Sequence, residues 1–340
     1  RDMTVCEAPG KVYLFGEHAV VYGEPAVPAA IERRARVTVE PRADDHVRVT
    51  AADLSLDGFT VEYAGTVDDP PDVNVPASLV DAAMGYVDAA VRQARAAADA
   101  PDAGFDITVE SDIPLGAGLG SSAAVVVAGI DAATRALGVP LDRRELADRA
   151  YRAEFEVQDG QASRADTFCS TMGGAVRVAG DNCESIDAPS LPFVIGFDGG
   201  AGDTGALVAG VRALREEHDF AADTVASIGD LVREGETLLA DADPTVSPSS
   251  ELLDGLGELM DFNHGLLAAL GVSARSLDSM VWAAREAGAH GAKLTGAGGG
   301  GCIVALDPSP ETPTALSFTQ GCVEAFRAEL ATDGVRVVEP

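Results

Sequence analysis

A glycine-rich segment ahead of an expected helix has the residue types of a phosphate-binding loop. It reads PLGAGLGSS, residues Pro114–Ser122, and follows an expected strand. Glycines let backbone amides approach an anion closely, and a helix beginning at Ser121 directs free N–H groups and the positive end of its dipole at that anion. No Lys-Ser or Lys-Thr pair follows the last glycine, so the segment is not a Walker loop. By itself it is equally consistent with a tightly packed turn between strand and helix.

A second glycine-rich segment lies closer to the C-terminus and reads KLTGAGGGGC, residues Lys293–Cys302. Four consecutive glycines lose much conformational entropy on folding, so a requirement of backbone geometry is the expected reason for keeping them. A disordered hinge is the alternative. Because the glycines run directly into the apolar stretch Ile303–Leu306, which favours a buried strand, we interpret the segment as an ordered loop.

A third segment combines a lysine, a carboxylate and a histidine around a short apolar strand. It reads APGKVYLFGEHAVVYG, residues Ala8–Gly23, and contains Lys11, Glu17 and His18. Lys11 and Lys293 are the only lysines of the chain, which makes both candidates for chemistry. Taken singly, His18 is more often a structural histidine and Glu17 a turn residue. Their combination with Lys11 favours a site.

In this order and at these separations, the three segments resemble the three signature motifs of the GHMP kinase superfamily of small-molecule kinases. The resemblance spans residues 8–306. Within the superfamily, the sequence GEHAVVYG is similar to the corresponding motif of the members that phosphorylate mevalonate. It implies an α+β, two-domain GHMP kinase fold with ATP and substrate in the interdomain cleft. We expect an N-terminal domain at 1–187 and a C-terminal domain at 188–340. The implied reaction is ATP-dependent phosphorylation of the 5-hydroxyl of mevalonate, a step in making isoprenoid precursors.

The resemblance also implies a catalytic pair. In the superfamily a conserved aspartate follows a serine in an A-S-x-x-D stretch ahead of two glycines, and this chain has ASRAD at 162–166 ahead of Gly173 and Gly174. Asp166 is thereby implied as the base that accepts the proton of the substrate hydroxyl. Lys11 is implied beside it, where its charge keeps the carboxylate ionised and stabilises charge developing on the transferred phosphoryl group.

A magnesium ion is the implied partner of the ATP phosphates. It prefers hard oxygen ligands, and the resemblance implies Ser122 and a glutamate on the helix ahead of Asp166. That helix contains Glu154 and Glu156, and the span from it to Asp166 is one residue longer than in relatives, with Asp159 the apparent insertion. We assign Glu154, with Glu156 as the fallback.

The remaining implied site residues fall into two groups. Nucleotide contacts are expected from Pro114, Gly116, Gly118, Leu119, Gly120, Ser121, Ser122, Gly296 and Gly298, and substrate contacts from Lys11, Glu17, His18, Asp166 and Thr295. Arg164 departs from the small or apolar residue usual at its position, and it is either a contact of the substrate carboxylate or a surface arginine. Lys293 is left out of the catalytic set because it can pair with a nearby carboxylate.

Two other classes of function fit the same motifs. Another superfamily member would act on phosphomevalonate, homoserine or a sugar, and a related decarboxylase is disfavoured because those relatives generally lack the lysine present here as Lys11. A nucleotide-binding regulator without turnover is the alternative that is not an enzyme. Lys11 together with Asp166 argues against it, because a sensor needs neither a base nor its partner.

Strands and helices are expected to alternate around these segments. Strands are expected at 12–15, 31–40, 46–50, 59–63, 105–109, 175–178, 192–197, 303–306 and 335–338, the first four forming an antiparallel sheet. Helices are expected at 77–98, 121–137 and 143–157, then through most of 204–288 and at 314–331. Asp142 is the expected cap of the third helix. A turn is expected at 68–72, where the sequence reads DDPPD.

The charge of the chain limits its partners. Its 340 residues include 55 Asp and Glu against 24 Lys and Arg, a formal net charge of −31. Such a field repels nucleic acids and anionic membrane surfaces, so we expect small-molecule partners, with a homodimer allowed. The scarcity of lysine indicates either adaptation to high salt, which screens repulsion between carboxylates over roughly 3 Å at 1 M, or an arginine-biased genome.

Five cysteines without a CxxC spacing predict neither a disulfide framework nor a zinc site. The longest uncharged apolar run, Ala123–Ile130, is far shorter than the roughly 20 residues that span a bilayer. The first residues contain no apolar run of signal-peptide length. The sequence therefore predicts a protein of a reducing cytoplasm.

Overall fold

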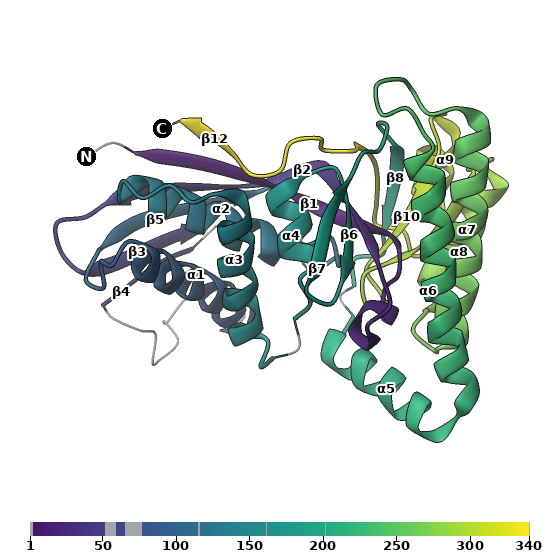
Figure 1. Cartoon of the computed structure of the whole chain (residues 1–340), viewed down its shortest axis with the longest axis horizontal. Coiled ribbons are helices and arrows are strands. Elements are labelled where there is room, and N and C mark those ends of the chain that lie inside the picture. Colours follow the sequence, from purple (N-terminus) through teal and green to yellow (C-terminus); the bar gives the residue numbers. More distant parts are fainter. Residues whose placement is uncertain are drawn as a thin grey trace.

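Two β-sheets with helices packed on them lie along the long axis of the molecule (Figure 1). The computed structural model describes residues 3–51, 59–64, 77–114, 116–160, 162–200 and 202–339. Strands and helices are mixed in both parts, so the expected α+β class is confirmed. The turn expected at 68–72 lies outside the described residues.

The larger sheet contains strands from the N-terminal half of the chain and one strand from its end. Its order is β12-β1-β2-β5-β3-β4, and β6 pairs with β2 and with β7. The bounds are Thr4–Phe15 (β1), Val27–Pro41 (β2), His46–Ala51 (β3), Phe59–Ala64 (β4), Phe105–Ser111 (β5), Ala175–Ala179 (β6), Asn182–Ile186 (β7) and Arg336–Glu339 (β12). The antiparallel pairing expected of the first four strands is confirmed for β1 with β2 and for β3 with β4. Strands β2 and β3 are not neighbours, however, because β5 enters between them after a helical crossover and runs parallel to β3.

Helices of the N-terminal half pack on the larger sheet. They are α1 (Ala77–Ala97), α2 (Ser121–Ala136), α3 (Arg143–Val157) and α4 (Ala165–Met172), with the short helix η1 at Ala19–Tyr22. Helix α2 contacts β1 and β2, and α1 and α3 pack against α2. The side chain of Asp142 accepts a hydrogen bond from the Glu145 amide at 2.9 Å, so the expected cap of α3 is confirmed.

The smaller sheet has the order β11-β8-β10-β9, and the remaining helices belong to the same part of the molecule. The strands are β8 (Pro192–Phe197), β9 (Gly291–Thr295), β10 (Cys302–Leu306) and β11 (Glu324–Glu329), and the helices are α5 (Thr204–Glu217), α6 (Asp219–Ala240), α7 (Ser250–Ala269), α8 (Arg275–Glu286) and α9 (Glu311–Ser317). Helices α7 and α8 pack on β9, and α9 packs on β8 and β11. No helix within the described ranges is long and apolar enough to cross a membrane.

The two sheets are joined by more than the connection between β7 and β8. Strand β12 pairs with β1, so the chain returns to the larger sheet at its end. One cluster of buried apolar side chains contains Phe15 and Val37 from the larger sheet and Ile195 and Leu294 from the smaller one. The domain boundary expected at 187/188 stays a prediction. It would place β12 in the C-terminal domain, although β12 pairs in the larger sheet, which is built mainly from the N-terminal half.

The helix expected at 314–331 is wrong beyond Ser317. Helix α9 ends at Ser317, and Gly321, with φ +94°, turns the chain into β11. Strand β11 pairs antiparallel with β8 and buries alternate side chains, Phe326 and Ala328. Pairing with a neighbouring strand therefore overrides the helix propensity of this Ala-, Glu- and Arg-rich stretch. Helix α4 and strands β7 and β9 were not expected from the sequence.

Candidate active site

A cleft of about 710 Å³ is lined by residues from both parts of the molecule. All residues predicted for the site line it: Lys11, Glu17, His18, Pro114, Gly116, Gly118, Leu119, Gly120, Ser121, Ser122, Glu154, Asp166, Thr295, Gly296 and Gly298. Three segments far apart in the sequence therefore meet in one cleft. Lys11 is the only lysine or arginine among the described lining residues.

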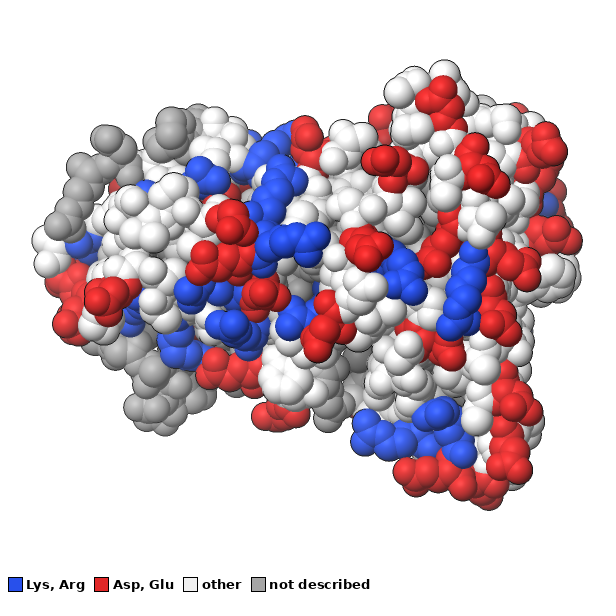
Figure 2. All heavy atoms as spheres, viewed as in Figure 1, with Lys and Arg blue, Asp and Glu red and all other residues white. Residues whose placement is uncertain are grey.

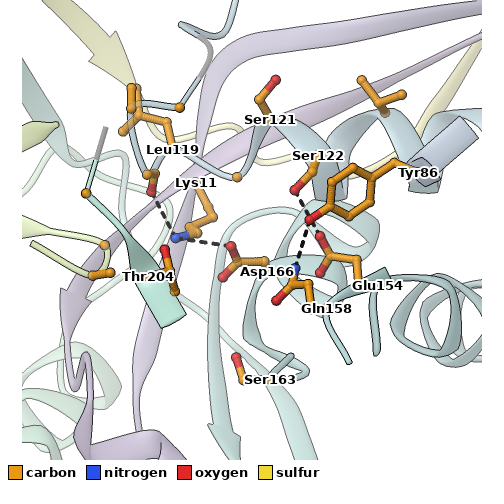
Figure 3. Close-up of a pocket in the computed structure, with 18 of the residues that line it drawn as sticks. Lys11, Tyr86, Leu119, Ser121, Ser122, Glu154, Gln158, Ser163, Asp166 and Thr204 are labelled. Carbon is orange, nitrogen blue, oxygen red and sulfur yellow. Dashed lines mark hydrogen bonds and ion pairs between the residues drawn. The ribbon is translucent and has the colours of Figure 1, made fainter. Parts of the chain in front are cut away.

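Lys11 and Asp166 point toward each other in this cleft (Figure 3). The Lys11 Nζ atom lies 3.3 Å from Asp166 Oδ2 and donates a hydrogen bond to the Gly118 carbonyl at 3.1 Å. The Lys11 side chain is 3% exposed, whereas that of Asp166, in the first turn of α4, is 29% exposed. A partly exposed carboxylate beside a buried ammonium group is suited to accept a proton from a hydroxyl in the cleft.

The first glycine loop lies directly against β1. The Lys11 amide donates to the Leu119 carbonyl at 2.8 Å, and a Cβ atom on Gly120 would lie 3.0 Å from Lys11 Cγ. Gly120 has φ +74° and precedes α2, whose first turn has no side-chain cap. Glycine therefore permits both the left-handed turn and the close approach. The free N–H groups at the start of α2 are suited to bind a phosphate.

Ser122 and Glu154 form a second polar pair in the cleft (Figure 3). The Ser122 hydroxyl donates to Glu154 Oε1 at 3.0 Å. Burial, followed by the negative charge of Asp166, raises the pKa of the Glu154 carboxyl to about 8. By contrast, Glu156 pairs with Arg92 at 3.0 Å and its side chain is 56% exposed. The geometry therefore favours Glu154 over Glu156 as an oxygen ligand at this position.

Glu17 and Lys293 form an ion pair in the interior, next to the cleft. Lys293 is fully buried and also donates to the carbonyls of Tyr13 and Leu294, at 3.3 and 2.7 Å. Its contacts are those of a structural lysine that joins β9 to the end of β1. The second carboxylate oxygen of Glu17, Oε2, is buried and has no hydrogen-bond partner, which leaves it available to accept from a hydroxyl in the cleft.

His18 and Thr295 hold the second glycine loop. His18 has φ +60°, and its Nε2 atom lies 2.8 Å from the Ala297 carbonyl. Because a carbonyl only accepts, Nε2 must carry the proton, and burial lowers the pKa of His18, so Nδ1 is an acceptor. Thr295 Oγ1 accepts from the Tyr13 amide at 2.8 Å. The substrate contacts predicted for both residues stay predictions.

The second glycine loop is packed against its neighbours. A Cβ atom on Gly296 would lie 3.2 Å from Gly118 Cα of the first loop, and one on Gly298 would lie 2.0 Å from the Val272 carbonyl oxygen. The Gly301 amide donates to Asp198 Oδ1 at 2.8 Å. The contacts are those of an ordered loop, because a side chain at either position would displace backbone.

Arg164 does not line the cleft. Its guanidinium group pairs with Asp148 at 2.5 Å and with Asp181 at 2.9 Å, and it lies over the ring of Tyr151. Of the two alternatives for this residue, the surface arginine fits the geometry.

Several residues that line the cleft were not predicted from the sequence, and Tyr13, Tyr86 and Gln158 are three of them. The Tyr13 hydroxyl donates to Asp166 Oδ1 at 3.4 Å. Gln158 Nε2 donates to the Tyr86 hydroxyl at 3.2 Å (Figure 3). Tyr13 is two residues from Lys11 on a strand, so the period-2 rule could have placed both side chains on one face. Tyr86 lies on α1 and Gln158 directly follows the end of α3, and no local pattern joins them.

The fold and this cleft define a class of small-molecule kinase. Residues 85–174 match the model of the GHMP kinases N terminal domain, and residues 249–317 match that of the GHMP kinases C terminal domain. The resemblance found in the motifs is thereby confirmed.

Relatives narrow the class to one family. The mevalonate kinase of Thermococcus gammatolerans is 39% identical over 339 residues, covering 98% of both chains. That of Methanothermobacter thermautotrophicus is 38% identical over 335 residues, covering 96% of this chain and 98% of the other. The crystal structure of the Methanococcus jannaschii mevalonate kinase has a TM-score of 0.78 and 26% identity, covering 97% of this chain and 98% of the other. The chain belongs to the mevalonate kinase family.

Proposed function

We propose that the protein transfers the γ-phosphoryl group of ATP to the 5-hydroxyl of mevalonate. The observation that carries the proposal is the Lys11–Asp166 pair, whose charged atoms lie 3.3 Å apart. The glycine loop beside this pair leads into α2, and the first residues of α2 line the same cleft. The choice of mevalonate comes from the family. A mevalonate kinase of L. major, of similar fold with a TM-score of 0.76 at 24% identity over 95% of this chain and 94% of the other, was solved in complex with R-mevalonate.

Asp166 is the base in this proposal. It accepts the proton of the substrate hydroxyl as the hydroxyl oxygen forms a bond to the γ-phosphorus, and the bond from that phosphorus to the bridging oxygen of ATP breaks to release ADP. The Lys11 ammonium group stabilises the negative charge on the transferred phosphoryl group, in a position where burial strengthens its field. Both groups act by being held in place before the reaction begins.

The ATP phosphates are assigned to the first glycine loop and the start of α2, and Mg²⁺ to Ser122 and Glu154. The pair fits a hard cation, because Glu154 is buried and Asp166 adds negative charge close by. When bound, Mg²⁺ would neutralise charge on the phosphates. Gly296 and Gly298 are assigned to the nucleotide because their loop closes the cleft against Gly118.

The substrate is assigned to the side of the cleft formed by Glu17, His18 and Thr295. Glu17 Oε2 and His18 Nδ1 are both acceptors, so they suit the hydroxyl groups of mevalonate better than its carboxylate. The cytoplasmic location, the homodimer and the adaptation to salt stay predictions from the sequence.

A coupled assay of ADP release at molar KCl, run across a panel of alcohols, tests the proposal. We expect the highest kcat/KM with mevalonate, and little ADP release without an alcohol. Preference for phosphomevalonate, homoserine or a sugar would overturn the substrate, and ATP binding without turnover of any alcohol would favour a regulator.

The base is tested with Asp166→Asn. We expect kcat to fall roughly a hundred- to ten-thousand-fold, the range for loss of a positioned acid or base, while the affinity for ATP is kept. The matched control is Asp181→Asn, because that side chain is 94% exposed and pairs with Arg164 outside the cleft. A mild effect of Asp166→Asn, or an equal effect of the control, would remove Asp166 as the base.

A further inference from the structure

Tyr13 is held in the cleft by contacts that the proposed reaction does not use. It is 7% exposed and lies two residues after Lys11 on β1, so both side chains point to the same face. The Tyr13 hydroxyl donates to Asp166 Oδ1 at 3.4 Å, and Lys11 Nζ lies 3.3 Å from Asp166 Oδ2. Two side chains of one strand therefore hold the two oxygens of one carboxylate.

The Tyr13 ring also contacts Lys11. The Lys11 Nζ atom lies 4.3 Å from the ring centroid, a distance at which a cation is attracted to the face of the ring. The backbone of Tyr13 is fixed from the smaller sheet, because its amide donates to Thr295 Oγ1 at 2.8 Å and its carbonyl accepts from Lys293 Nζ at 3.3 Å. Tyr13 is therefore a rigid support beneath both members of the pair.

The Tyr13 hydroxyl keeps its proton. Burial, followed by the charge of Asp166, raises the pKa of the phenol well above its usual value, so the group acts as a donor and not as a second base. Because a protonated phenol donates and a carboxylate accepts, this hydrogen bond runs from Tyr13 to Asp166.

We propose that Tyr13 is a positioning residue, whose hydroxyl fixes the plane of the Asp166 carboxylate and whose ring holds the Lys11 ammonium group beside it. The inference rests on the proposed function, because it takes Asp166 as the base. A carboxylate held at one oxygen rotates about its Cβ–Cγ bond, whereas one held at both oxygens keeps a single orientation. Such support raises kcat and leaves the affinity for substrates unchanged.

Packing alone is the competing explanation, because Tyr13 belongs to an apolar cluster with Ala165 and Phe168. Tyr13→Phe separates the two roles: it keeps the ring and removes only the hydroxyl. Tyr22→Phe is the matched control. The Tyr22 hydroxyl is buried and has no hydrogen-bond partner, and Tyr22 does not line the cleft.

The kinetic test uses whichever alcohol the wild type phosphorylates. We expect Tyr13→Phe to lower kcat about ten-fold, equivalent to about 1.4 kcal/mol, with the KM values for ATP and alcohol within about two-fold of wild type. In an Asp166→Asn background the same change has no further effect, because the group it orients is gone. Unchanged kcat, a change in KM alone, or an equal loss in the Asp166→Asn background would overturn the proposal.

A spectroscopic test does not depend on activity. We expect the near-ultraviolet tyrosine absorption to differ between wild type and Asp166→Asn, because the hydrogen bond of Tyr13 is changed. We expect no such difference between Tyr13→Phe and the variant that combines Tyr13→Phe with Asp166→Asn. Absence of the first difference would overturn the contact between Tyr13 and Asp166. A protein that phosphorylates no alcohol would overturn the proposed function and leave this difference in place, so the two failures are distinguishable. Circular-dichroism melts of each variant check that it folds.

Discussion

The Glu154 carboxyl occupies a position in which a negative charge is costly. It is 2% exposed, and its hydrogen bond from Ser122 and the distant charge of Lys11 do not compensate for burial and for Asp166. A buried charge of this kind is tolerated when it is neutralised by a proton or by a cation. Burial beside the charge of Asp166 therefore both raises the pKa of Glu154 and suits its carboxylate to bind a divalent ion that also contacts a triphosphate.

Removing the negative charge of Glu154 should change the magnesium requirement. We expect Glu154→Gln to raise the Mg²⁺ concentration for half-maximal ADP release by about ten-fold or more, equivalent to about 1.4 kcal/mol, because an amide oxygen carries no charge. Glu156→Gln is the matched control, since Glu156 pairs with Arg92 at the surface. A shift in the control with none in Glu154→Gln would reverse the assignment.

The sequence could predict the motif residues of the cleft, but not all of its lining residues or their contacts. Lys11, Ser122 and Asp166 lie in motifs whose order identifies a superfamily, and this was enough to predict that they share one site. The contact of Tyr13 with Asp166 joins positions 153 residues apart, and that of Lys293 with Glu17 joins positions 276 residues apart. No local pattern encodes such pairs, because the first is set by how α4 packs on β1 and the second by how β9 of the smaller sheet lies against β1.

At the scale of elements, β12 is attached to the larger sheet by charged side chains as well as by its backbone. Glu7 on β1 accepts from Arg36 on β2 at 2.7 Å through one oxygen and from Arg336 on β12 at 3.1 Å through the other. Partial burial alone would raise the pKa of the Glu7 carboxyl, but the hydrogen bonds and charges of the two arginines outweigh it and hold that pKa below its usual range.

The lowered pKa of Glu7 predicts a dependence of stability on pH. A carboxyl whose native pKa lies below its unfolded value stabilises the fold above the unfolded value, near 4.5, and this contribution is lost as pH falls through the native pKa. We expect Glu7→Gln to lower the free energy of unfolding by about 1 kcal/mol at pH 7, because both arginines are half-exposed and salt screens them.

Denaturant unfolding of both proteins at pH 7 and at pH 3 measures this difference, which should shrink at the lower pH. Glu329→Gln, at an exposed position of strand β11 in the smaller sheet, is the control. A difference that stays constant with pH would show that the ionised state of Glu7 does not matter for the attachment of β12.

Elements with a clear period were predictable and short paired strands were not. Helices α1, α2 and α3 follow the expected ranges within about two residues, because each buries a regular apolar face. Strand β9, by contrast, is buried at all five positions, and its sequence GAKLT includes the lysine that pairs with Glu17. A charged residue inside a buried strand departs from the apolar pattern of such strands. It is tolerated here only because Glu17, which is distant in the sequence, forms an ion pair with it.

At the scale of the whole molecule, the surface contains arginine as its only strongly basic side chain. Both lysines of the chain are buried, Lys11 at 2% and Lys293 at 0% exposure. Figure 2 shows acidic side chains over both parts of the face drawn, with arginines among them. The net charge of −31 is therefore carried at the surface, where its repulsion opposes the folded state and depends on salt.

Salt should determine whether this chain stays folded. At 1 M salt the repulsion between surface carboxylates is screened beyond roughly 3 Å, whereas at 0.1 M it reaches about 10 Å and adds up over many pairs. We expect the helical circular-dichroism signal to be lost on dialysis from molar to millimolar KCl and to return when KCl is restored. A molar neutral osmolyte such as sucrose serves as the control, because it favours burial without screening charge. Recovery of the helical signal with KCl and not with sucrose assigns the effect to charge. A melt that is unchanged across the KCl series would leave an arginine-biased genome as the explanation of the composition.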